Sequence, residues 1–119
     1  MTKIIAEIGW NHMGDIKLAK EMILQAKKNG ADLVKTQVFN TKYLKNGPWD
    51  KDGRREIYKK AELNKQKLKE LYDYAKKIKC TFFASAMSIE DAMLIKEINK
   101  DFIKIPSMES RNISLINYC

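Results

Sequence analysis

Hydrophobic and polar positions along the chain follow two alternating periods. Short apolar runs with period two predict strands at residues 3–8, 33–38, 81–85 and 102–105. Between the runs, apolar residues recur at three- and four-residue spacing and predict amphipathic helices, which start after Asp15, near Asn64 and at Ser88. A further helix is expected to begin near Asn112. The sequence therefore predicts an α/β protein.

Alternating strands and helices predict parallel strands joined by right-handed crossovers. Two architectures fit, an open doubly wound sheet and a (β/α)₈ barrel. A complete barrel has about 250 residues, whereas four strand–helix units fill the 119 residues of this chain. If the fold is a barrel, the chain is half of a domain. Alone it would be unstable, prone to aggregation or dimeric, because apolar surface and an edge strand would stay uncovered.

One connection is much longer than the others. Residues 38–63 join the second strand to the second helix, where about 2 to 6 residues are usual, and carry turn signals at Asn46-Gly-Pro and Asp52-Gly53. Tyr43, Trp49 and Tyr58 are interspersed among them. A lid over a site and a mobile excursion are both compatible with this segment.

Polar side chains interrupt the apolar runs near the strand ends. Period two places Glu7, Lys35, Ser85 and Lys104 on the face opposite to the apolar positions. Buried Lys and Glu are costly unless they are paired or bind a charged ligand, so either an internal ion-pair network or a wet anion site is possible. We favour a site that binds a phosphate or carboxylate group. The candidate hydrogen-bond donors are Lys35, Gln37, Ser85, Lys104 and Ser107, and the candidate acid/base or hydroxyl-binding groups are Glu7 and Glu109.

Composition narrows the function classes further. The net charge is +8 and the pI about 9.5, but the lysines are spread over helix faces and no nucleic-acid-binding motif appears. No apolar run is long enough for a membrane span or a secretory signal. We therefore expect a cytoplasmic protein that binds neither nucleic acid nor membrane, and Cys80 and Cys119 as free thiols. His12 is a single histidine in the first loop, and a hydrogen-bonding role is favoured over metal binding.

Taken in order, four motifs resemble the N-terminal half of the barrel domain of the sialic acid synthase family. They are Ala6-Glu-Ile-Gly9 with Asn11-His12, Gly30-Ala-Asp-Leu-Val-Lys-Thr-Gln37, Tyr58-Lys-Lys, and Ile103-Lys-Ile-Pro-Ser107 with Glu109. The resemblance extends over the whole chain. It implies a partial (β/α)₈ TIM barrel of about the first four βα units, an incomplete domain over residues 1–119. It also implies a transferase that condenses phosphoenolpyruvate with N-acetylmannosamine, or a related amino sugar, to a nonulosonic acid and phosphate.

The resemblance also implies roles for individual residues. Lys35, Gln37, Ser85, Lys104 and Ser107 match the phosphoenolpyruvate-binding set, Asn11 joins the substrate-binding residues, and Glu7 and Glu109 match the catalytic carboxylates. The family uses a divalent metal, Mn or Mg, whose ligands lie outside this chain, and a homodimer is expected at full length. This chain alone is expected to be incomplete as an enzyme.

Two departures and two alternatives accompany this interpretation. Phe83-Ala-Ser-Ala-Met87 stands where many members carry Ser-Thr-Pro-Phe, and Met108 stands where they carry glycine. The alternatives are another phosphoenolpyruvate-dependent 3-deoxy sugar acid synthase that uses a sugar phosphate, and a half-barrel without catalytic activity.

Overall fold

The computed structural model describes all 119 residues and contains one four-stranded parallel sheet. Its strands are β1 (Ile5–Gly9), β2 (Leu33–Val38), β3 (Thr81–Ala86) and β4 (Ile103–Lys104). They lie in the order β1-β2-β3-β4, and all three pairs are parallel. A doubly wound sheet reverses its order at a switch point. The order found here is that of a barrel, so the sheet decides between the two predicted architectures.

The predicted helices are confirmed with their caps. The helices α1 (Ile16–Lys28), α3 (Lys65–Lys77), α4 (Ile89–Ile98) and α5 (Ile113–Tyr118) follow the strands in turn. At each start a polar side chain accepts hydrogen bonds from the first turn, and these caps are Asp15, Asn64, Ser88 and Asn112. Such caps satisfy backbone N–H groups that have no partner within the helix.

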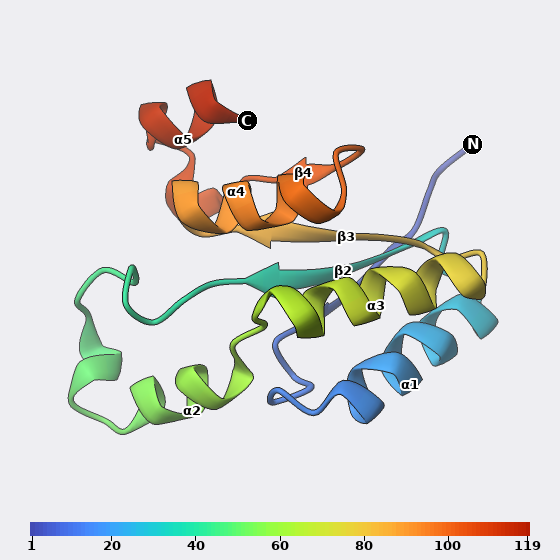
Figure 1. The fold of residues 1–119 in the computed structure, drawn as a ribbon, viewed down its shortest axis with the longest axis horizontal. Helices are drawn as coiled ribbons and strands as arrows, with labels where there is room; N and C mark the ends of the chain where they lie inside the picture. Colours follow the sequence, from blue (N-terminus) through green and yellow to red (C-terminus); the bar gives the residue numbers. More distant parts are fainter.

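The core lies on one face of the sheet, between the strands and the layer formed by α1, α3 and α4 (Figure 1). Val34, Val38 and Ala84 project into it, where they meet buried helix residues such as Ile23 and Leu71. The opposite face has no helix layer, and Ile5 on that face remains 52% exposed. Helices on a single face are the arrangement of a barrel wall, whose other face lines the interior.

The long connection over residues 38–63 contains secondary structure that the hydrophobic pattern did not predict. This segment, called the excursion below, contains a 3₁₀ turn, η1 (Pro48–Asp50), and the helix α2 (Arg54–Ala61). The helix escaped detection because its sequence is mostly charged and Gly53, at its N-cap, offers no capping side chain. The excursion lies at the end of the molecule to which the arrowheads of β2 and β3 point (Figure 1).

Smaller differences concern the strand ends. β4 has two residues instead of the predicted four, and the ring of Phe102 lies beside that of Phe83, with 6.0 Å between centroids. The thiols of Cys80 and Cys119 are free, as predicted. None of the helices combines the length and the apolar character that crossing a bilayer requires.

Candidate anion-binding site

Three of the predicted residues meet on the helix-free face of the sheet. Glu7 and Lys35 are partners in the β1–β2 register, and Lys35 forms an ion pair with the carboxylate of Glu7. The Nζ atom of Lys35 also donates a hydrogen bond to Ser85 Oγ at 2.8 Å. Lys35 is 8% exposed, whereas 45% of the Glu7 side chain is exposed. The cluster is therefore a buried ammonium group whose partner carboxylate reaches solvent.

A bulge at the end of β1 fixes the carboxylate of Glu7. The register skips one residue after Glu7, so Gly9 and not Ile8 lies opposite Thr36. Gly9 has a φ of +55°, a left-handed conformation that glycine adopts without the steric cost of a side chain. Its N–H donates to Glu7 Oε1 at 2.8 Å, and its carbonyl accepts from the Thr36 hydroxyl at 2.7 Å. The backbone thus holds one carboxylate oxygen while Lys35 holds the other.

Two more predicted residues lie on the same face without a side-chain hydrogen bond or ion pair to this cluster. Gln37 and Lys104 are the register partners of Ser85 on its two sides. Lys104 is exposed and forms none of the ion pairs of the chain. The face alternation predicted from the sequence is therefore confirmed for all four strands, and two lysines reach this face.

The remaining predicted residues lie in the loops after the strands. Asn11 is exposed after β1, and its side chain donates to the carbonyl of Ile8 at 2.9 Å. Ser107 is exposed and opens a second 3₁₀ turn, η2 (Ser107–Glu109). Both are on the carboxyl side of their strands, but neither side chain forms a hydrogen bond with Lys35.

Glu109 is buried and bonds to partners that sequence reasoning did not name. Lys45 Nζ, from the excursion, donates to its Oε1 at 3.0 Å, and Asn112 donates to its Oε2 at 2.8 Å. Burial alone would raise the pKa of Glu109, but the hydrogen bonds from Asn112 and Lys45 and the charge of Lys45 bring it below its ordinary value. The three-residue spacing between Glu109 and the helix cap Asn112 could have predicted their hydrogen bond. No local sequence pattern predicts the bond to Lys45.

His12 is fully buried in the loop after β1. Its Nδ1 accepts a hydrogen bond from the N–H of Gly14 at 3.0 Å, which confirms the predicted hydrogen-bonding role. Burial, together with the nearby charge of Lys67, lowers the pKa of the imidazole. His12 is therefore neutral at pH 7 and shapes the loop beside the cluster.

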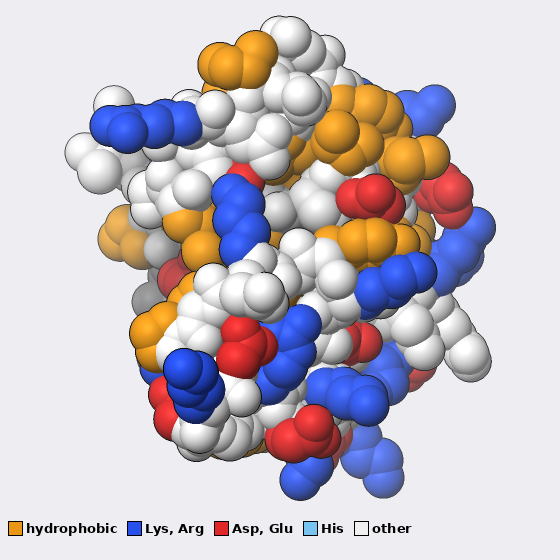
Figure 2. Space-filling view, turned by 90° about the vertical axis from the view of Figure 1, so that its left-hand side faces the viewer, with side chains coloured by type: hydrophobic (Ala, Val, Ile, Leu, Met, Phe, Trp, Pro, Cys, Tyr) orange, Lys and Arg blue, Asp and Glu red, His pale blue; other side chains and the backbone are white.

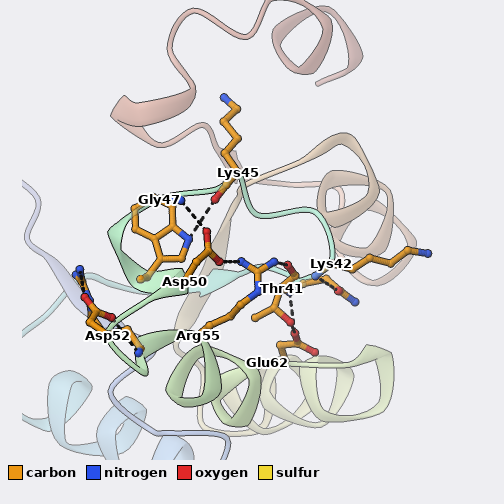
Figure 3. A network of polar contacts seen from close by, with 11 residues as sticks. Thr41, Lys42, Lys45, Gly47, Asp50, Asp52, Arg55 and Glu62 are labelled. Atoms are coloured by element: carbon orange, nitrogen blue, oxygen red, sulfur yellow. Dashed lines mark hydrogen bonds and ion pairs between the residues drawn. The ribbon is translucent and has the colours of Figure 1, made fainter.

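The excursion is held together by its own polar contacts (Figure 3). Arg55 lies between Asp50, with which it forms an ion pair, and the carbonyl of Thr41, to which it donates at 2.9 Å. The N–H of Thr41 donates to Glu62 Oε1 at 2.7 Å. In the view onto the carboxyl end of the sheet, basic and acidic side chains are interspersed among hydrophobic ones (Figure 2). The excursion is thus a folded unit above the strand ends.

Comparison with known proteins identifies the family. The sequence model of the NeuB family matches residues 22–119. The chain belongs to this family. It is 38% identical over 119 residues to an N-acetylneuraminate-9-phosphate synthase of Mus musculus, and 36% identical over 123 residues to an N,N'-diacetyllegionaminic acid synthase of Campylobacter jejuni. These alignments cover 92% and 94% of this chain but only 33% and 37% of the relatives.

Solved structures agree on the fold. The chain superposes with a TM-score of 0.83 and 31% identity on a sialic acid synthetase from Leptospira borgpetersenii, solved in complex with citrate. The superposition covers 97% of this chain and 39% of that protein. A polysaccharide biosynthesis protein of Chromobacterium violaceum, at 19% identity, matches in fold with the same score. The four units are therefore the first part of a NeuB-family (β/α)₈ barrel, and the chain spans little more than a third of its relatives.

Proposed function

We propose that this NeuB-family chain forms the phosphoenolpyruvate-binding part of a synthase. The enzyme would condense phosphoenolpyruvate with N-acetylmannosamine, or a related amino sugar, to a nonulosonic acid and phosphate. One observation carries the proposal: Lys35 is buried between Glu7 and Ser85 on the interior face of a barrel wall. Several of the matched relatives are named as synthases of this class of acid or its phosphate. We expect the full-length enzyme to act in the cytoplasm as a homodimer.

The interior face offers donors that suit a small polyanion. Lys35 and Lys104 would offset the charge of phosphate and carboxylate, because oppositely charged groups attract strongly where water is excluded. Additional donors come from uncharged side chains, namely Asn11, Gln37, Ser85 and Ser107. The solved Leptospira relative holds citrate, itself a small polyanion. Binding of phosphoenolpyruvate would bring a new partner to Lys35, which now pairs with Glu7.

The two carboxylates would serve the proton transfers of the reaction. The methylene carbon of phosphoenolpyruvate forms a bond to the aldehyde carbon of the sugar, whose oxygen takes up a proton. Water then adds to the resulting cationic carbon and loses a proton to a carboxylate. The C–O bond to phosphate breaks as the new hydroxyl gives up its proton, which leaves the ketone and inorganic phosphate. Glu7 has an exposed side chain beside Lys35, a position suited to steadying the cation or accepting that proton. Glu109 is the second candidate.

A divalent metal, Mn or Mg, would activate the sugar aldehyde in the full-length enzyme. No group of three His, Cys, Asp or Glu side chains in this chain is arranged to hold a metal ion. The residues of the four units therefore do not fit a metal centre of their own. Its ligands would come from outside this sequence, and no step above passes through the metal.

The decisive experiment measures phosphate release from phosphoenolpyruvate and N-acetylmannosamine by the full-length protein. Lys104→Ala should lower the rate by at least roughly 100-fold, in line with the removal of a single donor from a site of developing charge. The matched control is Lys100→Ala, another exposed lysine, which precedes β4. Equal activity of Lys104→Ala and the wild type would reject the assigned role. A preference for tetrose or pentose phosphates would instead favour a different phosphoenolpyruvate-dependent synthase.

A further inference from the structure

A lysine of the excursion is bonded to the buried carboxylate that follows β4. The Nζ atom of Lys45 lies 3.0 Å from Oε1 and 3.2 Å from Oε2 of Glu109, and Lys45 is the only ion-pair partner of this carboxylate. The side chain of Glu109 is 5% exposed, whereas that of Lys45 is 72% exposed. The pair therefore joins a buried acid of the barrel wall to the excursion above the strand ends.

The excursion presents this lysine from a folded support. The indole N–H of Trp49 donates to the carbonyl of Lys45 at 3.1 Å, and the N–H of Gly47 donates to Asp50 Oδ2 at 2.8 Å. Asp50 in turn forms an ion pair with Arg55 of α2. Figure 3 shows the side chain of Lys45 extending away from these contacts. The excursion thus holds the backbone of Lys45 and leaves its ammonium group to bind a partner outside the excursion.

The hydrogen bonds to Glu109 are distributed unevenly over its two carboxylate oxygens. An ionised carboxylate has about four lone-pair sites, two on each oxygen. Oε2 accepts from the side chain of Asn112 at 2.8 Å and from Lys45, whereas Oε1 accepts from Lys45 alone. One lone pair of Oε1 is therefore left without a protein donor. Oε1 is the atom at which Glu109 can take up a proton.

Lys45 also supplies the charge that keeps this carboxyl group ionised. Burial raises the pKa of Glu109, and the hydrogen bonds from Asn112 and Lys45 with the charge of Lys45 reverse that shift. Asn112 is uncharged, and the neighbouring cations Lys104 and Arg111 are exposed and form no ion pair with Glu109. Without Lys45 the buried carboxyl group would keep one neutral donor, so its protonated form would persist to higher pH.

We infer that Lys45 is a positioning residue, delivered by the excursion, that keeps Glu109 ionised so that its Oε1 accepts the proton of the attacking water. The inference rests on the proposed function, in which a carboxylate takes up that proton, and it assigns the step to Glu109. Glu7 is then left to steady the cationic carbon beside Lys35. Lys45 itself does not touch the reacting atoms, and the excursion acts as a lid that prepares a base.

The dependence of turnover on pH tests this role in the full-length protein. Lys45→Met should move the acid limb of the kcat profile for phosphate release to higher pH, because protonated Glu109 cannot accept a proton. On that limb kcat should fall roughly 10-fold, the worth of one hydrogen bond to a charged group. At alkaline pH the two profiles should converge, and KM for phosphoenolpyruvate should stay within about two-fold. Lys45→Arg keeps the charge and should restore the acid limb.

The matched control is Lys51→Met. Lys51 is an exposed lysine of the same excursion, and its side chain forms no hydrogen bond or ion pair, so this variant should keep the wild-type profile. An unshifted acid limb in Lys45→Met overturns the inference. So does a loss of equal size at every pH, which would show a structural role alone. Movement of the alkaline limb instead would make Glu109 a proton donor and likewise overturns it.

A second measurement follows Glu109 without turnover. In full-length protein labelled with ¹³C at the glutamate carboxyl carbons, the resonance of Glu109 is the one that Glu109→Gln removes. Its NMR titration should move to higher pH in Lys45→Met and return in Lys45→Arg. A titration that is the same in Lys45→Met and the wild type overturns the inference.

The two hypotheses fail differently. Absence of phosphate release with every sugar acceptor rejects the proposed function, and the NMR titration then decides alone whether Lys45 holds the Glu109 carboxylate ionised. Normal phosphate release with an unshifted acid limb in Lys45→Met leaves the proposed function standing and rejects the role of Lys45.

Discussion

The two faces of the sheet differ although the same strands build both. In β2, Val34 is fully buried against the helices, whereas the next residue, Lys35, points to the other face and pairs with Glu7. In β3, Ala84 and Ser85 divide in the same way. One face therefore holds the hydrophobic core and the other holds the proposed anion site, and a shift of one residue in the pattern would exchange them. Substitutions on the two faces should consequently separate stability from activity.

The largest effect is expected on the interior face. Lys35→Met removes the buried ammonium group. If Lys35 holds the phosphate as proposed, the loss of this preorganised charge should lower the rate of phosphate release roughly 10³-fold. The free energy of unfolding in urea should change by less than about 1 kcal/mol, since the exposed Glu7 regains water. Lys69→Met, at an exposed lysine of α3, is the control. A Lys35→Met enzyme with wild-type turnover would refute the anion site.

The opposite result is expected on the helix-covered face. Leu71 of α3 is fully buried in the core. Leu71→Ala should reduce the free energy of unfolding by about 3 kcal/mol through lost apolar burial and the cavity left behind. Activity per folded molecule, measured after active-site titration at low temperature, should stay within about two-fold. A large loss of turnover in fully folded protein would show that the two faces are not independent.

Asp91 is an exception to this division and makes stability depend on pH. It is buried at the start of α4, its Oδ2 has no hydrogen-bond partner, and Glu62 of the excursion lines the same small pocket. Burial raises the pKa of Asp91 to about 6. Because the folded-state pKa exceeds the unfolded value, this group favours the fold below about pH 4, and that contribution is lost as the pH rises towards 6.

The corresponding variant removes this dependence. Asp91→Asn should stabilise the protein at pH 7 by about 2 kcal/mol and flatten the change in unfolding free energy between pH 4 and 6. Chemical denaturation across this pH range measures both effects. An unchanged pH profile would mean that Asp91 gains a partner in the full-length protein.

The smallest effect is expected where the excursion meets the strand ends. Lys45→Met removes a hydrogen-bond donor from buried Glu109 and should cost about 1 kcal/mol at pH 7. The folded-state pKa of Glu109 lies below its ordinary value, so the ionised carboxylate stabilises the fold at pH values above that ordinary pKa. This contribution is lost as the pH falls through the folded-state pKa. Wild type and Lys45→Met should therefore converge in acid, which denaturation at pH 3 and 7 will test. Persistence of the full difference at pH 3 would indicate a packing role for the lysine stem.

The parts of this structure that the sequence predicted are those set by local rules. The two-residue alternation of the strands correctly placed Lys35 and Ser85 on the same face of the sheet. Capping residues correctly marked the starts of helices, for example Asp15 at the start of α1. The helix α2 has no such cap, and its charged surface hid the inward contacts of Tyr58. The bond between Lys45 and Glu109 joins residues 64 positions apart, which no local pattern encodes.

The bulge at Gly9 was only partly predictable from the sequence. A glycine at the end of a strand pattern is a known sign of a bulge, but the hydrogen bond from its N–H to Glu7 depends on the resulting backbone direction. The roles of the site residues remain predictions, and the experiments above are their test.

The strand order has a consequence for how the protein is made. Every strand pairs only with its neighbours in sequence, so no pairing waits for a distant segment of the chain. Each new strand–helix unit can dock on the preceding one as soon as it is synthesised, and loop closure stays short at each step. The order of translation is therefore also an order in which this barrel wall can grow.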